Sequence, residues 1–336
     1  MIIKHISEID TKEWDDFVYK HPLGNFFQTS LFFNLHIGFS NYEPIAYAVV
    51  KDNVIQGVLV GIIQSNYKWP IRNLTKRAII IGGPLIETNS KEVFNFLILN
   101  ILNKIENKCI YIQIRNIFDV TNYDFANFNF EFENHLDIIH DLSSDEKSII
   151  NKISKSKLAN VRKSFNKGAI VREIENINEF NLGVDYIIST YNKIGLPCPE
   201  KSFFIKAFNN YSQSGFIKCF GAFFENKLIA IRIEICYKDT IYDWYTGSLS
   251  GFNNIYPNDI LPYCILLYGK KNNFILFDFG GAGKPEKPYG VRDHKIKFGG
   301  TIVNYGRYEK VNNMFLMNIF KLGYKTKKIV DKVFLK

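Results

Sequence analysis

The residues best suited to chemistry lie in a glycine-rich stretch, DFGGAGKPEKPYGVRDHKIKFGG, at residues 278–300. A strand that ends in Gly-Gly and continues into a charged loop is a common way to build a binding site on a rigid scaffold. Here Arg292 and His294 are candidates for substrate contact, and Lys295 directly follows His294. Because the Walker pattern GxxxxGKS/T and the pattern GxGxxG are both absent, neither a phosphate-binding P-loop nor a Rossmann site is expected. A long surface loop without function is the plainer alternative.

A second group of charges follows Ser143, where the sequence predicts one long helix that runs to Gly168. At about 100° per residue, five cations fall on one face of this helix: Lys152, Lys155, Arg162, Lys163 and Lys167. Apolar residues lie opposite, with Lys157 as an exception among them. No acidic residue occurs between Glu146 and Gly168, whereas solvated helices usually mix charges of both signs. We therefore expect an anion-binding face, with a merely solvated face as the alternative.

Other candidate residues are more isolated. Asp243, in the segment DWYTG, could act as a general base at the end of a strand, or it could be a structural carboxylate. Tyr245, two residues later, is a candidate for substrate contact. His135, Asp137 and His140 have a spacing compatible with metal ligands, but they lie in a strand-like segment, and we expect no metal site.

Helices and strands alternate in two halves that share one plan. The first half predicts helices at 11–19 and 91–107 and strands at 45–50, 54–63, 78–81 and 109–116. The second predicts helices at 177–191 and 258–271 and strands at 169–173, 216–224, 228–237, 241–246 and 274–279. This alternation is typical of an α/β (α+β) fold. We expect domains at 1–142 and 143–311, with a basic amphipathic helix at 312–336 that packs back on the first.

Length and composition set the class of protein. At about 150 residues per domain, 336 residues suggest two domains. Five cysteines without a CxxC pair exclude a disulfide scaffold and a zinc ribbon, and they fit a reducing compartment. The N-terminus is charged where a signal peptide would be apolar, so we expect a cytoplasmic protein. The net charge of +9 favours an anionic partner.

Four stretches give the chain a family resemblance. They are HPLGNFFQTSLF (21–32), SKSKLANVRKSFNKG (154–168), YDWYTGSL…YPNDIL (242–261) and DFGGAG…YGVRDHKIKFGG (278–300). In this order they resemble the FemABX-type aminoacyltransferases, and the last stretch resembles the closing "DxGG…GVxxFKxxFGG" pattern of that family. The four stretches are distributed over nearly the whole chain.

This resemblance implies two tandem GNAT-like acyltransferase domains. It implies transfer of an amino acid from aminoacyl-tRNA to an amine of a phosphorylated peptidoglycan precursor, without a metal or redox cofactor. Lys295 takes the position implicated in charge stabilisation at the transferring ester, which suits an ammonium beside a developing oxyanion. Arg162, with Lys155 and Lys163 beside it, takes the position that contacts the precursor's phosphates. His294 departs from the family pattern, which has an aromatic ring there.

Two other functions remain open. One is an acyl-CoA-dependent N-acyltransferase of a nucleotide- or lipid-linked amino sugar in surface-polysaccharide synthesis. The CoA-binding pattern Q/R-x-x-G-x-G/A is absent, which favours a donor other than CoA. The other is an RNA-binding protein, which would explain the charge but not the glycine-rich ending. The basic segment 312–336 could also rest on the anionic cytoplasmic face of the inner membrane.

Overall fold

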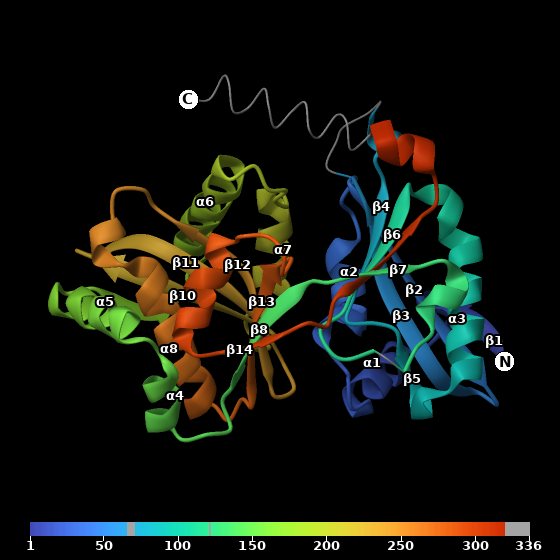
Figure 1. The fold of residues 1–336 in the computed structure, drawn as a ribbon, viewed down its shortest axis with the longest axis horizontal. Helices are drawn as coiled ribbons and strands as arrows, with labels where there is room; N and C mark the ends of the chain where they lie inside the picture. Colours follow the sequence, from blue (N-terminus) through green and yellow to red (C-terminus); the bar gives the residue numbers. More distant parts are fainter. Residues whose placement is uncertain (66–70, 121, 320–336) are drawn as a thin grey trace. The chain divides into compact units, whose positions relative to one another are not determined.

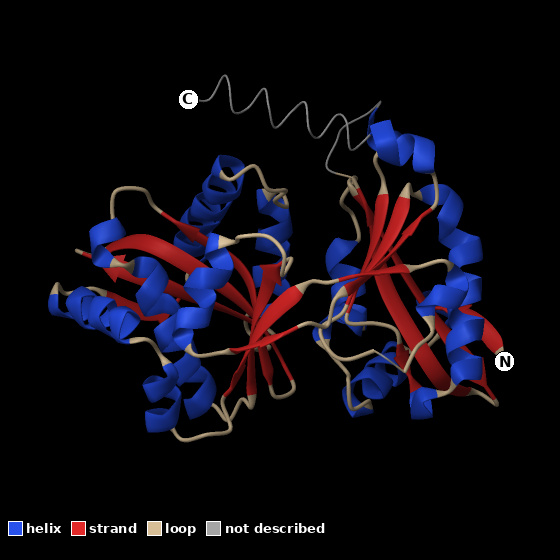
Figure 2. Ribbon diagram, viewed as in Figure 1, coloured by secondary structure: helices blue, strands red, loops and turns tan. Residues whose placement is uncertain are grey.

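The computed structural model describes residues 1–65, 71–120 and 122–319. The chain folds as two compact units, one of Met1–Asn134 with the described residues from Tyr305 to Ile319, and one of His135–Asn304. Each unit is a mixed β-sheet with helices packed on it (Figures 1 and 2). The predicted α/β architecture with two similar halves is therefore confirmed. Within the described residues, no helix has both the length and the apolarity needed to cross a bilayer.

The first unit has a sheet of eight described strands, in the order β1-β2-β3-β4-β6-β15-β7 with β5 paired to β3. The pair β4–β6 is parallel, and every other described pair is antiparallel. The strands are β1 (Ile2–His5), β2 (Tyr42–Lys51), β3 (Val54–Gln64), β4 (Arg77–Ile81), β5 (Leu85–Ile86), β6 (Tyr111–Arg115), β7 (Glu131–Glu133) and β15 (Arg307–Val311). The α-helices are α1 (Thr11–Lys20), α2 (Ser30–His36) and α3 (Lys91–Ile105).

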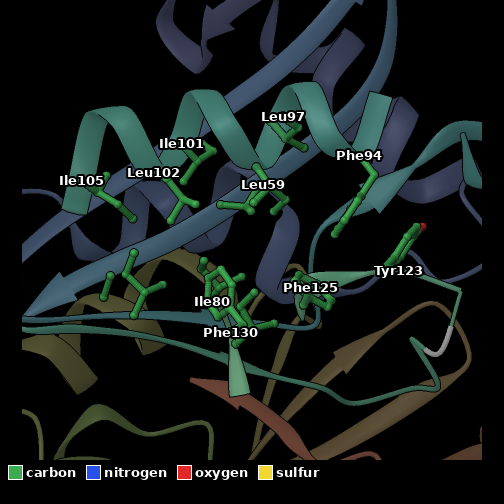
Figure 3. Close-up of a cluster of buried hydrophobic side chains, with 14 of the residues drawn as sticks. Leu59, Ile80, Phe94, Leu97, Ile101, Leu102, Ile105, Tyr123, Phe125 and Phe130 are labelled. Atoms are coloured by element: carbon green, nitrogen blue, oxygen red, sulfur yellow. The ribbon is translucent and has the colours of Figure 1, made fainter. Parts of the chain in front are cut away.

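The main core of the first unit lies between α3 and the sheet (Figure 3). Ser90 caps α3 by accepting a hydrogen bond from the Val93 amide, which agrees with the predicted start of this helix. Side chains three or four positions apart on α3 form one buried stripe, Phe94, Leu97, Ile98, Ile101 and Ile105. The ring of Phe94 stacks on that of Tyr123 with centroids 4.8 Å apart.

The second unit has a sheet of seven described strands, in the order β14-β8-β13-β12-β11-β10-β9. Its strands are β8 (Leu136–Asp141), β9 (Ile170–Glu173), β10 (Ile217–Phe224), β11 (Lys227–Tyr237), β12 (Thr240–Ser248), β13 (Leu276–Gly283) and β14 (Thr301–Val303). Its α-helices are α4 (Glu146–Lys152), α5 (Lys155–Asn166), α6 (Ile177–Lys193), α7 (Lys201–Tyr211), α8 (Pro257–Lys271) and α9 (Gly290–Lys295). Here β12 and β13 form the parallel pair.

The boundaries between the units differ from the expected 142/143 and 311/312. Strand β8 lies before residue 142 but pairs with β13 and β14, so it belongs to the second sheet. Strand β15 lies before residue 312 but pairs with β6 and β7, so it belongs to the first sheet. The chain therefore passes between the units at Asn134/His135 and at Asn304/Tyr305. Pairing between distant segments, which local sequence does not reveal, sets these boundaries.

The single long helix predicted from Ser143 to Gly168 is wrong. The chain forms two helices, α4 and α5, separated at Ile153 and Ser154. Asp145, not Ser143, caps α4, and Ser154 starts α5 by accepting a hydrogen bond from the Lys157 amide. Ser154 caps a new helix directly after the break. The helical spacing of apolar residues therefore continues across the break, and the sequence pattern does not reveal it.

The predicted terminal helix at 312–336 lies mostly outside the described residues. Residues 314–319 are helical, and Met317 is buried against Ile79, Ile110 and Tyr111 of the first unit. This part of the segment packs on the first unit, and the packing of the segment as a whole remains a prediction.

One polar side chain is built into the backbone of the first sheet. Gln28 is fully buried, and its amide nitrogen donates to the carbonyls of Val60 (3.1 Å) and Ile81 (2.7 Å). Its amide oxygen accepts from the Val60 N–H at 2.8 Å. Trp14 in turn donates its indole N–H to the Gln28 carbonyl at 2.9 Å. The segment HPLGNFFQTSLF thus has a structural explanation, since it supplies hydrogen bonds to strands β3 and β4.

We predict that Gln28→Ala destabilises the protein by roughly 2–3 kcal/mol, because it leaves a buried N–H and two carbonyls without this partner. Urea unfolding followed by circular dichroism would measure the loss. Gln56→Ala is the control on the same sheet, since the Gln56 amide makes only long contacts of 3.4 and 3.5 Å to nearby carbonyls. Equal losses in the two variants would contradict the role given to Gln28.

Candidate active site

Lys295, the last residue of α9, places its ammonium inside the second unit. Nζ donates to the carbonyl of Phe279, and it lies 3.4 Å from the carbonyl of Gly281. The carboxylate Oδ2 of Asp243 is 3.9 Å from Nζ, and only 11% of the Lys295 side chain is exposed. The sequence analysis singled out Lys295 and Asp243 separately, and the structure places their charged groups next to each other.

The ammonium lies where two parallel strands stop pairing. The β12–β13 register runs from Thr240 opposite Leu276 to Tyr242 opposite Asp278, and there it ends. The next residues along the two strands are Asp243 and Phe279. The register of β13 against β8 is irregular after Asp278, whose Oδ1 accepts a hydrogen bond from the Gly280 N–H at 2.8 Å. Two strands that separate here thus supply the groups around Lys295, and Asp243 lies within β12 rather than at the end of a strand.

A buried ion pair fixes the Asp243 carboxylate. Arg232 of β11 donates from Nη1 to Oδ1 of Asp243 at 2.7 Å, and the two side chains are 5% and 9% exposed. The guanidinium of Arg232 also lies 4.9 Å from the centroid of the Phe279 ring. Trp244 is an extra residue in the β11–β12 ladder, since Ile233 pairs with Tyr245 and Glu234 with Asp243. This bulge sets Asp243 opposite Glu234.

The surroundings of Lys295 act on its charge in opposite directions. Burial lowers the pKa of Lys295, and the guanidinium of Arg232 lowers it further. The carboxylates of Asp243, Asp137 and Asp278 raise the pKa again by favouring the ammonium. The result is a desolvated cation supported by nearby carboxylates. Such a group can stabilise an oxyanion more strongly than an exposed lysine can.

Two buried carboxyl groups beside this site have raised pKa values. Burial, and then the charge of Asp243, raise the pKa of Glu234 well above its ordinary value. Within the described residues, neither oxygen of the Glu234 carboxyl has a hydrogen-bond partner. Burial also raises the pKa of Asp278 to about 6, although its bond from the Gly280 amide and the charge of Lys295 act against this. A neutral carboxyl lowers the cost of such burial.

His294 and the cations of α5 lie in the same unit. His294 Nδ1 is 2.9 Å from Nζ of Lys157, a buried lysine of α5. Three predicted phosphate contacts, Lys155, Arg162 and Lys163, are exposed on α5. They remain candidates for binding an anion.

Arg292 and Tyr245 have structural neighbours that the sequence did not reveal. The Arg292 guanidinium donates to the carbonyls of Ala282 (3.4 Å), Lys284 (2.9 Å) and Lys287 (2.7 Å), and so it holds the glycine-rich loop. The ring of Tyr245 packs edge-on against Phe204 at 4.9 Å and lies 5.5 Å from the ring of Tyr191. Substrate contact by these two residues remains a prediction.

The histidine segment considered for metal binding forms part of a strand. Among the described residues, no three His, Cys, Asp or Glu side chains gather in a group that could hold a metal ion. His140 is buried with its ring centroid 5.6 Å from those of Phe277 and Phe279. Burial and the charges of Lys152 and Lys295 lower the pKa of His140 to about 4, so the ring is neutral.

Three charged residues near the site were missed from the sequence: Arg232, Glu234 and Asp259, whose carboxylate pairs with Lys157. Arg232 and Glu234 lie two residues apart in the apolar run LIAIRIEICY, so they point to one face of the strand. Lys157 was visible only as a charge within an apolar stripe. In both places, a charge at a buried position was the available signal.

The fold resembles those of known acyltransferase-type structures. The crystal structure of FemX superposes with a TM-score of 0.72 at 15% identity, over 95% of this chain and 99% of FemX. A tandem GNAT protein from the clavulanic acid biosynthesis pathway gives 0.59 at 8% identity, over 93% and 99%. L-PGS from Bacillus licheniformis gives 0.52 at 14% identity, over 76% and 80%. No protein-family model and no curated protein matches the sequence. The similarity shows that this chain has a tandem GNAT-like fold.

We predict that Glu234→Gln makes stability less dependent on pH. The native Glu234 holds its proton above the ordinary pKa of 4.5, whereas the unfolded chain releases it there. Wild-type stability therefore falls as pH rises through this range, and the glutamine variant lacks this contribution. Urea unfolding at about pH 5 and about pH 8 should show the variant gaining on the wild type as pH rises.

Glu225→Gln, on the exposed turn between β10 and β11, is the control for loss of a carboxylate from the same pair of strands. A difference between wild type and Glu234→Gln that does not change with pH would show that Glu234 is already ionised.

Proposed function

We propose that this protein is an aminoacyltransferase of the FemX type. It would move an amino acid from aminoacyl-tRNA to an amine of a phosphorylated peptidoglycan precursor. The observation that carries the proposal is the ammonium of Lys295, buried between the Phe279 carbonyl and the Asp243 carboxylate at the end of a parallel strand pair. The fold shared with FemX over nearly the full length of both chains supports it.

The proposed chemistry needs few protein groups. The acceptor nitrogen attacks the ester carbonyl, an amide bond forms, and the bond from carbon to the ribose oxygen of the tRNA breaks. The proton lost by the nitrogen goes to the departing oxygen. Lys295 would stabilise the negative charge on the carbonyl oxygen in the tetrahedral intermediate. Asp243, already paired with Arg232, would favour the charged form of Lys295 rather than remove a proton.

The cations of α5 would hold the phosphates of the acceptor. Arg162 and Lys163 are exposed, and an arginine can bind a phosphate through two hydrogen bonds at once. Lys155, on the same helix, adds a further positive charge. This assigns phosphate binding to α5 and bond formation to the region of α9, both within the second unit.

Acyl transfer from acyl-CoA to an amino sugar is the second candidate. The similarity of the fold to a tandem GNAT protein over 93% of this chain favours it. The two candidates share the charge-stabilising role of Lys295 and differ in the donor. A donor experiment therefore separates them.

We predict that a UDP-linked muropeptide binds in calorimetry and acetyl-CoA does not, and that charged tRNA then supports transfer to the bound muropeptide. Arg162→Ala should weaken muropeptide binding because it removes a phosphate contact. Binding of acetyl-CoA with acetylation of a nucleotide-linked amino sugar would establish the second candidate instead. Binding of tRNA without any transfer would favour the RNA-binding alternative.

We also predict that Lys295→Met lowers kcat by about 100- to 1,000-fold, the usual effect of removing one oxyanion-stabilising donor. KM for the acceptor should change little, because the ammonium acts mainly in the transition state. Lys297→Met is the matched control, since the Lys297 side chain is exposed and its known contact is through the backbone carbonyl to the Ser154 N–H. Equal losses in kcat and acceptor affinity would argue against the role given to Lys295.

A further inference from the structure

A buried ion pair lies next to the residue that precedes Lys295. Lys157 of α5 donates from Nζ to Oδ1 of Asp259, in the first turn of α8, at 2.5 Å. The two side chains are 11% and 7% exposed. Asn160, one turn along α5, donates to Oδ2 of the same carboxylate at 2.7 Å. Both oxygens of Asp259 are therefore occupied, which a buried carboxylate requires.

The same ammonium reaches the ring of His294 on α9. Lys157 Nζ lies 2.9 Å from Nδ1 of His294, and Oδ1 of Asp259 is 4.0 Å from that nitrogen. An ammonium has donors and no acceptor, so Nδ1 must accept this hydrogen bond. The ring is then neutral and has its proton on Nε2.

The electrostatics of the ring agree with this geometry. Burial and the charge of Lys157 lower the pKa of His294 to about 4, with a smaller effect of Arg232 in the same direction. The carboxylate of Asp259 and the backbone of Asn258 act in the opposite direction. A phenylalanine at this position could not accept the bond from Lys157. The ring nitrogen is therefore matched to the buried lysine.

The backbone after His294 is anchored to the same helix. The carbonyl of Lys297 accepts a hydrogen bond at 2.8 Å from the N–H of Ser154, which caps α5. Gly299 has a φ of +89°, and a Cβ there would lie 2.5 Å from the carbonyl oxygen of Lys152. Residues 294–299 are thus fixed to the α4–α5 junction on both sides of Lys295.

We propose that Lys157 and Asp259 are positioning residues, which hold His294 as the neutral ring with its proton on Nε2 and thereby fix the adjoining Lys295 at the Phe279 carbonyl. The effect of this arrangement on catalysis rests on the proposed function, whereas the protonation state of the His294 ring does not. It couples the helix proposed to bind phosphate to the lysine proposed to act on the ester.

Nitrogen NMR of protein labelled with ¹⁵N-histidine tests the state of the ring without any assay of activity. The wild-type protein should show His294 with an unprotonated Nδ1 and a protonated Nε2, unchanged between about pH 6 and pH 8. A His294 that has its proton on Nδ1, or that titrates in this range, would overturn the proposal. Because this measurement uses the wild type, it does not depend on whether a variant folds.

Lys157→Met tests whether Lys157 sets the protonation state of the His294 ring. Loss of the ammonium leaves the Asp259 carboxylate beside the ring, so the pKa of His294 should rise and the ring should begin to titrate in the same pH range. Lys218→Met is the matched control, because it removes a lysine paired at 2.7 Å with Glu173 elsewhere in the same unit. An unchanged His294 signal in folded Lys157→Met would overturn the coupling.

Kinetics then separate positioning from binding. Lys157→Met should lower kcat by about tenfold or more with little change in KM for either substrate, and Lys218→Met should do neither. An altered His294 signal without loss of kcat would reject the positioning role. If the wild type transfers no aminoacyl or acyl group, the proposed function fails while the NMR result still decides the state of the ring.

Discussion

The buried charge of Lys295 constrains the rest of the second unit. An ammonium removed from water must be supported by nearby carboxylates, and Asp243, Asp137 and Asp278 favour its charged form. Glu234 adds a fourth carboxyl, while Arg232 is the second cation. Burial, and to a smaller extent the charge of Asp243, makes Glu234 and Asp278 hold their protons more tightly than usual. The raised pKa of Glu234 thus reduces the negative charge that would otherwise gather beside Lys295 and Arg232.

The geometry of the second sheet positions these charged groups. Two parallel strands stop pairing at Tyr242 and Asp278, and a bulge at Trp244 sets the side chain of Asp243 opposite Glu234. The first unit has the same plan, with β4 and β6 as its parallel pair. There, the polar group built into the sheet is the neutral amide of Gln28. Two similar scaffolds thus accommodate different polar groups.

Much of this fold is readable from local pattern. The helix expected at 91–107 appears as Lys91–Ile105. The strands expected at 45–50 and 54–63 appear as β2 and β3, with left-handed Asp52 and Asn53 between them. The break at Ile153 was hidden because apolar spacing continues across it. The Lys157–Asp259 pair joins residues about a hundred positions apart, and spacing along the chain holds no information on such contacts. Lys295 was identified from its glycine-rich segment and the resemblance of that segment to a known pattern, whereas Asp243 was singled out from its own segment as a candidate general base.

The exchange of strands has a consequence for the order in which the protein is made. Strand β15 lies between β6 and β7, so the first sheet is incomplete until residues 307–311 leave the ribosome. The described strands of the second sheet lie between residues 136 and 303, and they emerge earlier. The first sheet therefore cannot be completed until β15 has been synthesised, and β6 stays unpaired on one side. The second unit, which is inserted within the first in the sequence, can fold before that. An unpaired strand edge invites association with other chains, which makes this interval the vulnerable stage of biosynthesis.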